Sequence, residues 1–267
     1  MRKFIKEKFP EPVISTIRRS RDYLEHFPKA LEASCHPWRR DTIRRLKKYE
    51  NKYQGKRCFV IGNGPSLRKT DLTKLRNEYT FGLNRIYLMF PKIGFPTTFF
   101  VSVNDLVIEQ TAADIQKMTI PKFVSWRAHK WLEPADDLYF LFTTYTGAKF
   151  ARKATGRLWE GATVTFVALQ LAYYFGFEKV ILIGVDHSFK TKGKANTTIT
   201  SQGDDPDHFN PSYFGKGFRW QLPDLDTSET AYAMARKAFE EDGRKIVDAT
   251  IDGKLIIFPK IKYDQLF

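Results

Sequence analysis

The sequence predicts an α/β fold, a mostly parallel sheet flanked by helices, on three observations. Short apolar runs such as 58–62 and 179–184 are continuous rather than alternating, which is typical of strands buried on both faces. Longer stretches with helical character lie between them, at 105–118, 162–175 and 227–242. A polar stretch, 186–226, is too long for an ordinary connection and predicts a lid.

The individual strands follow from apolar runs bounded by turn residues. We expect them at 58–62, 79–83, 97–103, 121–125, 138–143, 179–184, 245–249 and 255–258. The last helix has the clearest boundary signals: Thr227 or Ser228 can cap it, Glu229 falls in its first turn and Gly243 follows its last turn. Strands alternating with helices place the carboxyl ends of the strands at one edge, where ligands of such sheets bind.

The positive charge is concentrated at the start of the chain. The net charge is +14, and residues 1–57 hold 17 Lys and Arg against 7 Asp and Glu. We therefore divide the chain into a basic, mainly helical N-terminal arm, 1–56, and an α/β domain, 57–267, with its lid at 186–226. Apolar residues between the basic clusters, among them Leu24, Phe27 and Leu31, give the arm an amphipathic pattern. A solvated helical arm and a contact with an anionic membrane surface both fit this pattern.

Other classes of protein are disfavoured by composition. No apolar run is long enough to cross a membrane, and no secretory signal is recognisable. The two cysteines, Cys35 and Cys58, do not form a disulfide framework or a metal motif. We expect a cytoplasmic protein, with the inner face of the membrane as its peripheral location if the arm binds lipid. Nucleic acid is not an expected partner, because the arm has no recognisable reading motif.

The stretch CFVIGNGPSL, residues 58–67, ends the first strand in a glycine-rich turn. Gly62 and Gly64 allow a sharp turn whose backbone N–H groups could hold an anion. No Lys follows as in a Walker A loop, and Pro65-Ser66 stands where a GxGxxG motif would continue. A tight structural turn and a phosphate cradle are the two interpretations.

Three asparagines favour the ligand-binding interpretation. Asn63, Asn84 and Asn104 each fall just beyond a predicted strand, so all three are expected at the same edge of the sheet. An amide can donate to a phosphate and accept from a ribose or a base. Each could also serve as a turn or helix-cap residue.

The lid and the strand before it carry the candidate catalytic groups, Asp186 and His208. Asp186 follows Gly184 at the carboxyl edge, with His187 and Ser188 next to it. His208 could act as a general base oriented by a neighbouring carboxylate. In the other interpretation a divalent cation for phosphoryl transfer is bound by the histidines and the acidic residues Asp186, Asp204, Asp205 and Asp207.

Several stretches resemble the bacterial sialyltransferases of glycosyltransferase family 42 and the related MptE-like proteins, whose named member is a 6-hydroxymethylpterin diphosphokinase. The resemblance spans residues 57–258 and is carried by VIGNGPSL at 60–67, GLNRIYL at 82–88, SVNDL at 102–106, GATVTFVALQLAYYFGFEKVILIGVDHSF at 161–189 and DHF at 207–209. The sialyltransferases have a tyrosine pair after the GxD strand, where this chain has Asp186-His187-Ser188-Phe189-Lys190.

The resemblance implies a Rossmann-like, GT-A-like nucleotide-binding domain that transfers a sialic-acid-like keto-acid sugar from a CMP-activated donor to a glycan acceptor. It implies no metal cofactor, with His208 as the base. The residues implied to bind the nucleotide are Gly62, Asn63, Gly64, Pro65, Ser66, Asn84, Asn104, Thr163 and Gly184. Those assigned to the substrate and its phosphate are Arg157, His187, Ser188, Tyr213, Lys216 and Arg219.

Two alternatives stay open beside the transferase. One is a Mg-dependent pyrophosphokinase of the MptE type. The other is a non-catalytic protein that binds a nucleotide or a glycan. The expected partners of the transferase are a nucleotide sugar and a glycan acceptor, and the sequence leaves a homo-oligomer open.

Overall fold

The computed structural model describes residues 11–267; in its first helix it describes the side chains of Ser20, Asp22 and the residues from Leu24 on. Residues 1–10 of the predicted arm lie outside the described part. The helices are α2 (Glu11–Cys35), α3 (Pro37–Leu46), α4 (Phe90–Ile93), α5 (Asp105–Lys117), α6 (Val164–Phe175) and α7 (Leu225–Glu241). The strands are β1 (Arg57–Ile61), β2 (Tyr79–Leu83), β3 (Phe99–Ser102), β4 (Lys122–Ser125), β5 (Leu138–Thr144), β6 (Arg157–Trp159), β7 (Lys179–Ile183), β8 (Thr198–Thr200), β9 (Arg219–Gln221) and β10 (Lys245–Asp248).

Eight of these strands form one parallel sheet in the order β10-β7-β1-β2-β3-β4-β5-β6. The chain runs outward from β1 to β6 and then returns to the other side of β1 with β7. The strand order therefore reverses between β1 and β7, which is where open α/β sheets bind ligands. The predicted α/β class and mostly parallel sheet are confirmed.

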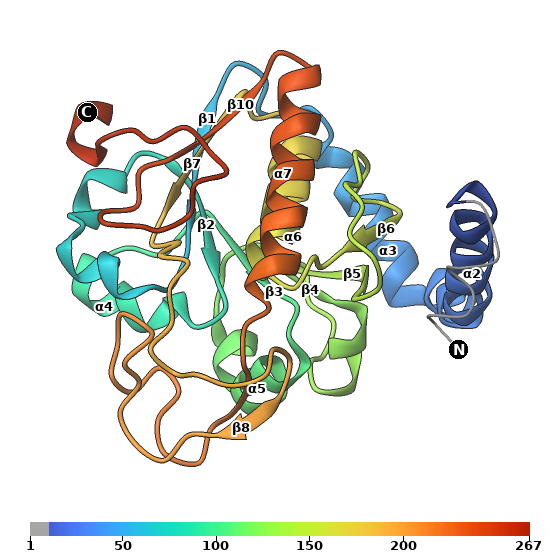
Figure 1. Cartoon of the computed structure of the whole chain (residues 1–267), viewed down its shortest axis with the longest axis horizontal. Helices are drawn as coiled ribbons and strands as arrows, with labels where there is room; N and C mark the ends of the chain where they lie inside the picture. Colours follow the sequence, from blue (N-terminus) through green and yellow to red (C-terminus); the bar gives the residue numbers. More distant parts are fainter. Residues whose placement is uncertain (1–10) are drawn as a thin grey trace.

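The sheet is covered on both faces, as its continuous apolar strands require. On one face, alternate strand residues such as Val60, Val101 and Leu182 pack against α6 and α7. Figure 1 shows these two helices together on the same side of the sheet. On the other face, Phe59, Ile181 and their neighbours pack against α5 and the segment that follows β10.

The structure differs from the sequence prediction at two strands and one helix cap. Residues 255–258 form no strand; within the described residues they belong to a loop that returns the chain to a single bridge between Asp248 and Lys260. The short strand β6 was not predicted, because its three residues begin with Arg157 and form no apolar run. Helix α7 begins at Leu225, and its cap is Asp224, whose side chain accepts from the Thr227 N–H at 3.0 Å, rather than Thr227 or Ser228.

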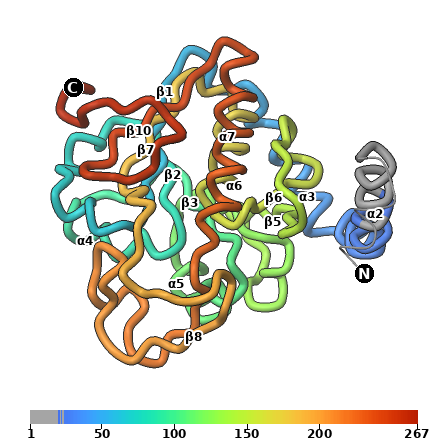
Figure 2. Tube along the Cα trace, viewed as in Figure 1, coloured from blue at the N-terminus to red at the C-terminus, as the bar shows by residue number. Residues whose placement is uncertain are grey.

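The stretch 186–226 has structure of its own. It contains the antiparallel pair β8–β9, and Figure 2 shows it as an orange loop at one end of the molecule. Gln110 on α5 binds Arg219 twice, donating to its carbonyl at 2.8 Å and accepting from its N–H at 2.9 Å. The stretch is therefore attached to the helix that follows β3, and we keep the name lid for 186–226.

The N-terminal helices lie beside the far edge of the sheet, next to β5 and β6 (Figure 1). In α3, Thr42 accepts from the Phe140 N–H at 3.1 Å, and Arg45 donates to the Leu138 carbonyl at 2.8 Å. In α2, Asp22 is paired with Arg157 of β6 at 2.9 Å. No helix within 11–267 is long and apolar enough to cross a membrane. The boundary between arm and domain at residue 56 stays a prediction.

Candidate functional site

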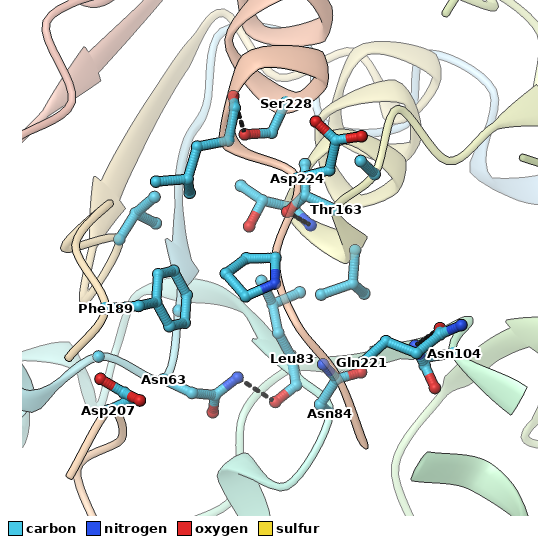
Figure 3. Close-up of a pocket in the computed structure, with 18 of the residues that line it drawn as sticks. Asn63, Leu83, Asn84, Asn104, Thr163, Phe189, Asp207, Gln221, Asp224 and Ser228 are labelled. Atoms are coloured by element: carbon cyan, nitrogen blue, oxygen red, sulfur yellow. Dashed lines mark hydrogen bonds between the residues drawn. The ribbon is translucent and has the colours of Figure 1, made fainter. Parts of the chain in front are cut away.

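A cavity of about 250 Å³ lies at the carboxyl ends of β1, β2, β3 and β7, at the reversal of strand order. The loops after these strands form one wall, and the lid and the first turns of α6 and α7 close the others. Figure 3 shows Asn63, Asn84 and Asn104 along one side, with Phe189 and Asp207 of the lid nearby. Of the residues predicted for the site, those that line the cavity are Gly62, Asn63, Gly64, Asn84, Asn104, Thr163, Gly184, Asp186, His187, Ser188 and His208.

The glycine turn after β1 is joined to the loop after β7. The N–H groups of Gly62 and Gly64 donate to the carbonyls of Ile183 and Gly184 at 2.8 and 2.9 Å, and the Ser66 N–H donates to Asp186 at 3.0 Å. The expectation that these N–H groups are free to hold an anion is therefore wrong for all three. A Cβ on Gly64 would collide with the Asp186 carboxylate, so close packing of two loops explains this glycine.

Each of the three asparagines uses part of its amide for structure. Asn63 donates to the Leu83 carbonyl at 3.0 Å, Asn84 accepts from Ser102 Oγ at 3.0 Å, and Asn104 caps α5 by accepting from the Val107 N–H at 3.2 Å. Within the described chain the buried Oδ1 of Asn63 has no hydrogen-bond partner. An unsatisfied buried acceptor is costly, so a ligand donor at this oxygen would be favourable.

His208 lies on the lid wall of the cavity and is held by a buried carboxylate. Its Nδ1 is 2.7 Å from Oδ2 of Asp205, whose side chain is 3% exposed. Because an ionised carboxylate only accepts, Nδ1 carries the proton and Nε2 is the basic nitrogen. The ring stacks on Tyr213 with centroids 4.0 Å apart.

The lid carries His208 close to the glycine turn. The Phe209 N–H donates to the Asn63 carbonyl at 2.9 Å, and Arg68 donates to the carbonyls of His208 and Phe209 at 2.8 and 2.9 Å. These bonds hold the part of the lid that carries His208 against the turn after β1. The topology thus brings His208 close to Asn63, which lies 145 positions earlier in the sequence.

A second histidine on the cavity wall, His187, is paired with a carboxylate outside it. His187 has a backbone φ of +55° and its Nε2 is 2.8 Å from Glu229 of α7. Thr163 caps α6 by accepting from the Thr165 N–H at 3.2 Å and lies 3.3 Å from the Tyr232 hydroxyl. Tyr232, which lines the cavity from α7, was not predicted as a site residue, and neither was Glu229, which holds His187 from the same helix.

The side chains lining the cavity include no Lys or Arg among the described residues, but they include the carboxylates of Glu160, Asp186, Asp207 and Asp224. Each carboxylate accepts hydrogen bonds from the protein. Asp186 accepts from the N–H and hydroxyl of Ser66, and burial raises the pKa of its carboxyl against these hydrogen bonds. Asp207 accepts from the N–H and hydroxyl of Thr191, at 3.2 and 2.5 Å.

Glu160 is the site residue that the sequence analysis missed most plainly. It is 2% exposed and accepts from Arg127 at 2.8 Å and from Thr143 Oγ1 at 2.6 Å. Burial raises the pKa of its carboxyl, with Arg127 opposing. Its only sequence signal was an acidic residue at the start of the apolar stretch EGATVTF, which does not distinguish it from a surface residue.

Several residues assigned to the substrate lie elsewhere. Arg157 pairs with Asp22 of α2, and Arg219 pairs with Glu109 at 2.8 Å on the outer side of the lid. Tyr213 is fully buried behind His208, where its hydroxyl accepts from the Arg85 N–H. None of these three lines the cavity, and neither do Pro65, Ser66 and Lys216.

The positions of the acidic residues and histidines can be compared with what the metal-dependent alternative requires. Within the described part of the chain, no three His, Cys, Asp or Glu side chains are grouped as metal ligands would be. Asp205 instead binds His208 and accepts from the N–H groups of Asp207 and Phe214 at 2.8 and 3.1 Å. The acidic groups of the lid therefore do not fit a preformed divalent-cation site.

Comparisons with known proteins agree with this architecture. The model of a family described as 6-hydroxymethylpterin diphosphokinase MptE-like matches residues 39–192. The MAf glycosyltransferase from Magnetospirillum magneticum AMB-1 is structurally similar, with a TM-score of 0.50 and 12% sequence identity over 86% of this chain and 39% of that one. This chain thus spans about two fifths of that protein, and at this identity the likeness concerns the fold. The sequence matches no curated protein significantly.

Proposed function

We propose that this chain, which belongs to the MptE-like family, is a glycosyltransferase whose cavity binds a nucleotide-activated sugar. The donor we propose is a CMP-linked, sialic-acid-like keto-acid sugar, and the acceptor is a hydroxyl of a glycan. The fold shared with a glycosyltransferase supports the general class. The finer assignment rests on the arrangement of His208 and the asparagines.

The observation that carries the proposal is the His208–Asp205 pair on the cavity wall. The carboxylate holds the imidazole so that Nε2 can accept a proton. A general base near a nucleotide-binding edge is what a direct displacement at an anomeric carbon requires of the protein. The nearby unsatisfied Oδ1 of Asn63 would accept from the amino group of a cytosine or from a ribose hydroxyl.

In the proposed reaction, His208 Nε2 removes the proton of the acceptor hydroxyl as its oxygen bonds to the anomeric carbon. The bond from that carbon to the CMP phosphate oxygen breaks, and CMP leaves with the bonding electrons. His187 and Ser188, which line the cavity, are the side chains we assign to the departing phosphate. We assign the nucleotide to Asn63, Asn84, Asn104 and Thr163 at the sheet edge.

The experiment compares His208→Ala with His129→Ala, which removes a histidine that lies outside the cavity. Transfer from CMP-activated sugars is measured together with the thermal shift caused by CMP. We expect His208→Ala to lose transfer by about 10²–10⁴-fold while the CMP shift survives. Undiminished turnover of His208→Ala would contradict the assignment of the base.

The family description favours a second candidate, a diphosphokinase that transfers a pyrophosphoryl group from ATP. Such chemistry commonly relies on Mg²⁺, and the acidic residues of the site do not fit a preformed cation site. A panel of CMP, CTP, CDP, UDP, GDP and ATP, each with and without Mg²⁺, separates the candidates. A thermal shift with CMP or CTP that ignores Mg²⁺ supports the transferase, and a shift restricted to ATP with Mg²⁺ supports the kinase. Nucleotide binding without turnover of any donor would support the remaining alternative, a protein that binds a nucleotide but does not catalyse a reaction.

A further inference from the structure

A second cavity, of about 240 Å³, lies between the N-terminal helices and the edge of the sheet. It is lined from α2 and α3 on one side and from β5 and the start of β6 on the other. It shares no lining residue with the cavity at the sheet edge. The inference drawn from it is independent of the proposed function.

The titratable side chains that line this cavity are two arginines and a histidine. Arg39, Arg157 and His26 line it, and no Asp or Glu does among the described residues. Asp22 lies next to both Arg157 and His26, whereas Arg39 has no carboxylate partner among the described residues, so an anionic ligand is favoured at Arg39.

The two arginines differ in how their charge is compensated. Arg157 donates to both carboxylate oxygens of Asp22 at 2.9 Å. Arg39 is 2% exposed, and Nη2 donates only to backbone carbonyls, of Thr155 at 2.8 Å and Gly156 at 3.2 Å. Its buried Nη1 has no hydrogen-bond partner in the described chain. Burial lowers the pKa of Arg39 to about 10, so the guanidinium still carries its charge at neutral pH.

A buried guanidinium without a carboxylate is costly, because desolvation is not offset by an opposite charge. An oxyanion entering beside Thr155 and Gly156 would supply both the missing acceptor and the missing charge. The remaining walls are mainly apolar and include Ile43 of α3 and Phe142 of β5. A ligand that fits both features has an anionic head and an apolar body.

We propose that this cavity binds an amphiphilic anion, a phosphate-type oxyanion joined to a short apolar chain, with the head against Arg39. Two sources share this chemistry, a free amphiphile and a lipid at an anionic membrane surface. Leu24 and Leu31 of the neighbouring helix α2 are 70% and 53% exposed, which suits a helix that approaches lipid. The experiment therefore has one arm for each source.

The first arm measures binding of hexyl phosphate by calorimetry to the whole chain, with inorganic phosphate and hexanol as probes that lack the tail or the charge. We expect hexyl phosphate to bind more tightly than either. Arg39→Gln is expected to weaken binding about tenfold or more. Ala30→Phe, which fills the cavity from α2 and keeps Arg39, should weaken it as well. Absence of hexyl phosphate binding, or equal affinity in wild type and Arg39→Gln, would overturn the proposal.

Matched controls show that a loss is local. Arg40→Gln removes the neighbouring exposed arginine, which lies outside the cavity, and should leave hexyl phosphate binding unchanged. The far-ultraviolet circular dichroism and melting temperature of each variant report whether it is folded. If Arg39→Gln fails to fold, Ala30→Phe decides the proposal. Nucleotide binding at the first cavity is measured separately, so failure of the proposed function would not change this result.

The second arm measures co-sedimentation with phosphatidylglycerol and phosphatidylcholine vesicles. Binding to phosphatidylglycerol alone that falls in Arg39→Gln and in the double variant Leu24→Ser, Leu31→Ser supports the cavity with lipid as the source. Hexyl phosphate binding without sedimentation supports the cavity with a free amphiphile as the source. Sedimentation that Arg39→Gln leaves unchanged, with no hexyl phosphate binding, contradicts the cavity and indicates a surface contact of the arm alone.

Discussion

Asp186 and Ser66 are joined by two hydrogen bonds, in which the Ser66 N–H and hydroxyl donate to the two carboxylate oxygens at 3.0 and 2.6 Å. The pair connects the loop after β1 to the loop after β7, at the point where the strand order reverses. Gly64 passes directly over this carboxylate, and no side chain fits there. The floor of the candidate site is therefore set by contact between two loops.

Replacing Gly64 by Ala should destabilise the fold. The added Cβ would collide with Asp186, and relieving the overlap disturbs both loops, at a cost of about 1–3 kcal/mol. The free energy of unfolding from a denaturant titration measures this. Gly203→Ala is the matched control, because a Cβ at Gly203 meets open space. Equal stability of the two variants would show that the loops separate readily.

Asp205 should matter for the reaction through His208. Asp205→Asn keeps a side chain of the same size but can donate to Nδ1, which favours the tautomer with the proton on Nε2. Under the proposed function we expect kcat to fall by about 10²-fold or more while KM for the donor changes little. Asp204→Asn alters the exposed neighbour and should leave both constants near wild type. A parallel fall in KM and kcat for both variants would indicate disturbance of the lid instead.

The sequence was sufficient to predict the sheet because its strands are continuous apolar runs, and seven of the eight appear close to their expected positions. The exception, β6, is three residues long and begins with Arg157, so no local pattern marks it. The strand expected at 255–258 is absent, although this segment does have an apolar pattern. Its apolar residues pack against the sheet from a loop, and apolar composition alone cannot distinguish the two.

The candidate site was predictable where it depends on strand ends and was not where it depends on tertiary contacts. Asn63, Asn84 and Asn104 follow strands, and the topology brings them to one edge. Nothing local shows that the N–H groups of Gly62 and Gly64 donate to the end of β7 and the loop after it, or that Arg157 pairs with α2. The partners of these groups come from distant segments of the chain, and the type of a residue does not indicate which distant segment it will contact.

The Asp22–Arg157 pair should hold α2 against β6 in a pH-dependent way. The hydrogen bond from Arg157 lowers the pKa of Asp22 to about 2, from an ordinary value of 3.8. A lowered pKa means that the pair contributes stability above about pH 4 and loses it as the pH falls toward 2. Because the Asp22 side chain is still a quarter exposed and water screens the pair, we expect about 1 kcal/mol rather than the full value of the shift.

Hydrogen exchange of the α2 amides measures this contribution. Asp22→Asn should speed their exchange at pH 6 and have a smaller effect near pH 2, where about half of the wild-type carboxyl is itself protonated. Arg44→Gln, which breaks an exposed pair with Asp41 on α3, should not change exchange in α2 at either pH. Unchanged exchange in Asp22→Asn at pH 6 would mean that other contacts hold the helix.

Gln221 should govern how firmly the lid closes the cavity. Its Oε1 accepts from Nδ2 of Asn104 at 3.2 Å, which connects β9 in the lid to the cap of α5 (Figure 3). Gln221→Ala removes the acceptor and leaves the cap bond from Asn104 Oδ1 to Val107 in place. We expect faster hydrogen exchange across 196–222 with little change in global stability and, under the proposed function, nucleotide binding that is weaker by about fivefold. Gln202→Ala is the control, since Gln202 donates only to the Thr200 carbonyl on the exposed side of the lid. Equal exchange in the two variants would show that the lid is held by its other contacts, such as the bonds between Gln110 and Arg219, rather than by the bond to Asn104.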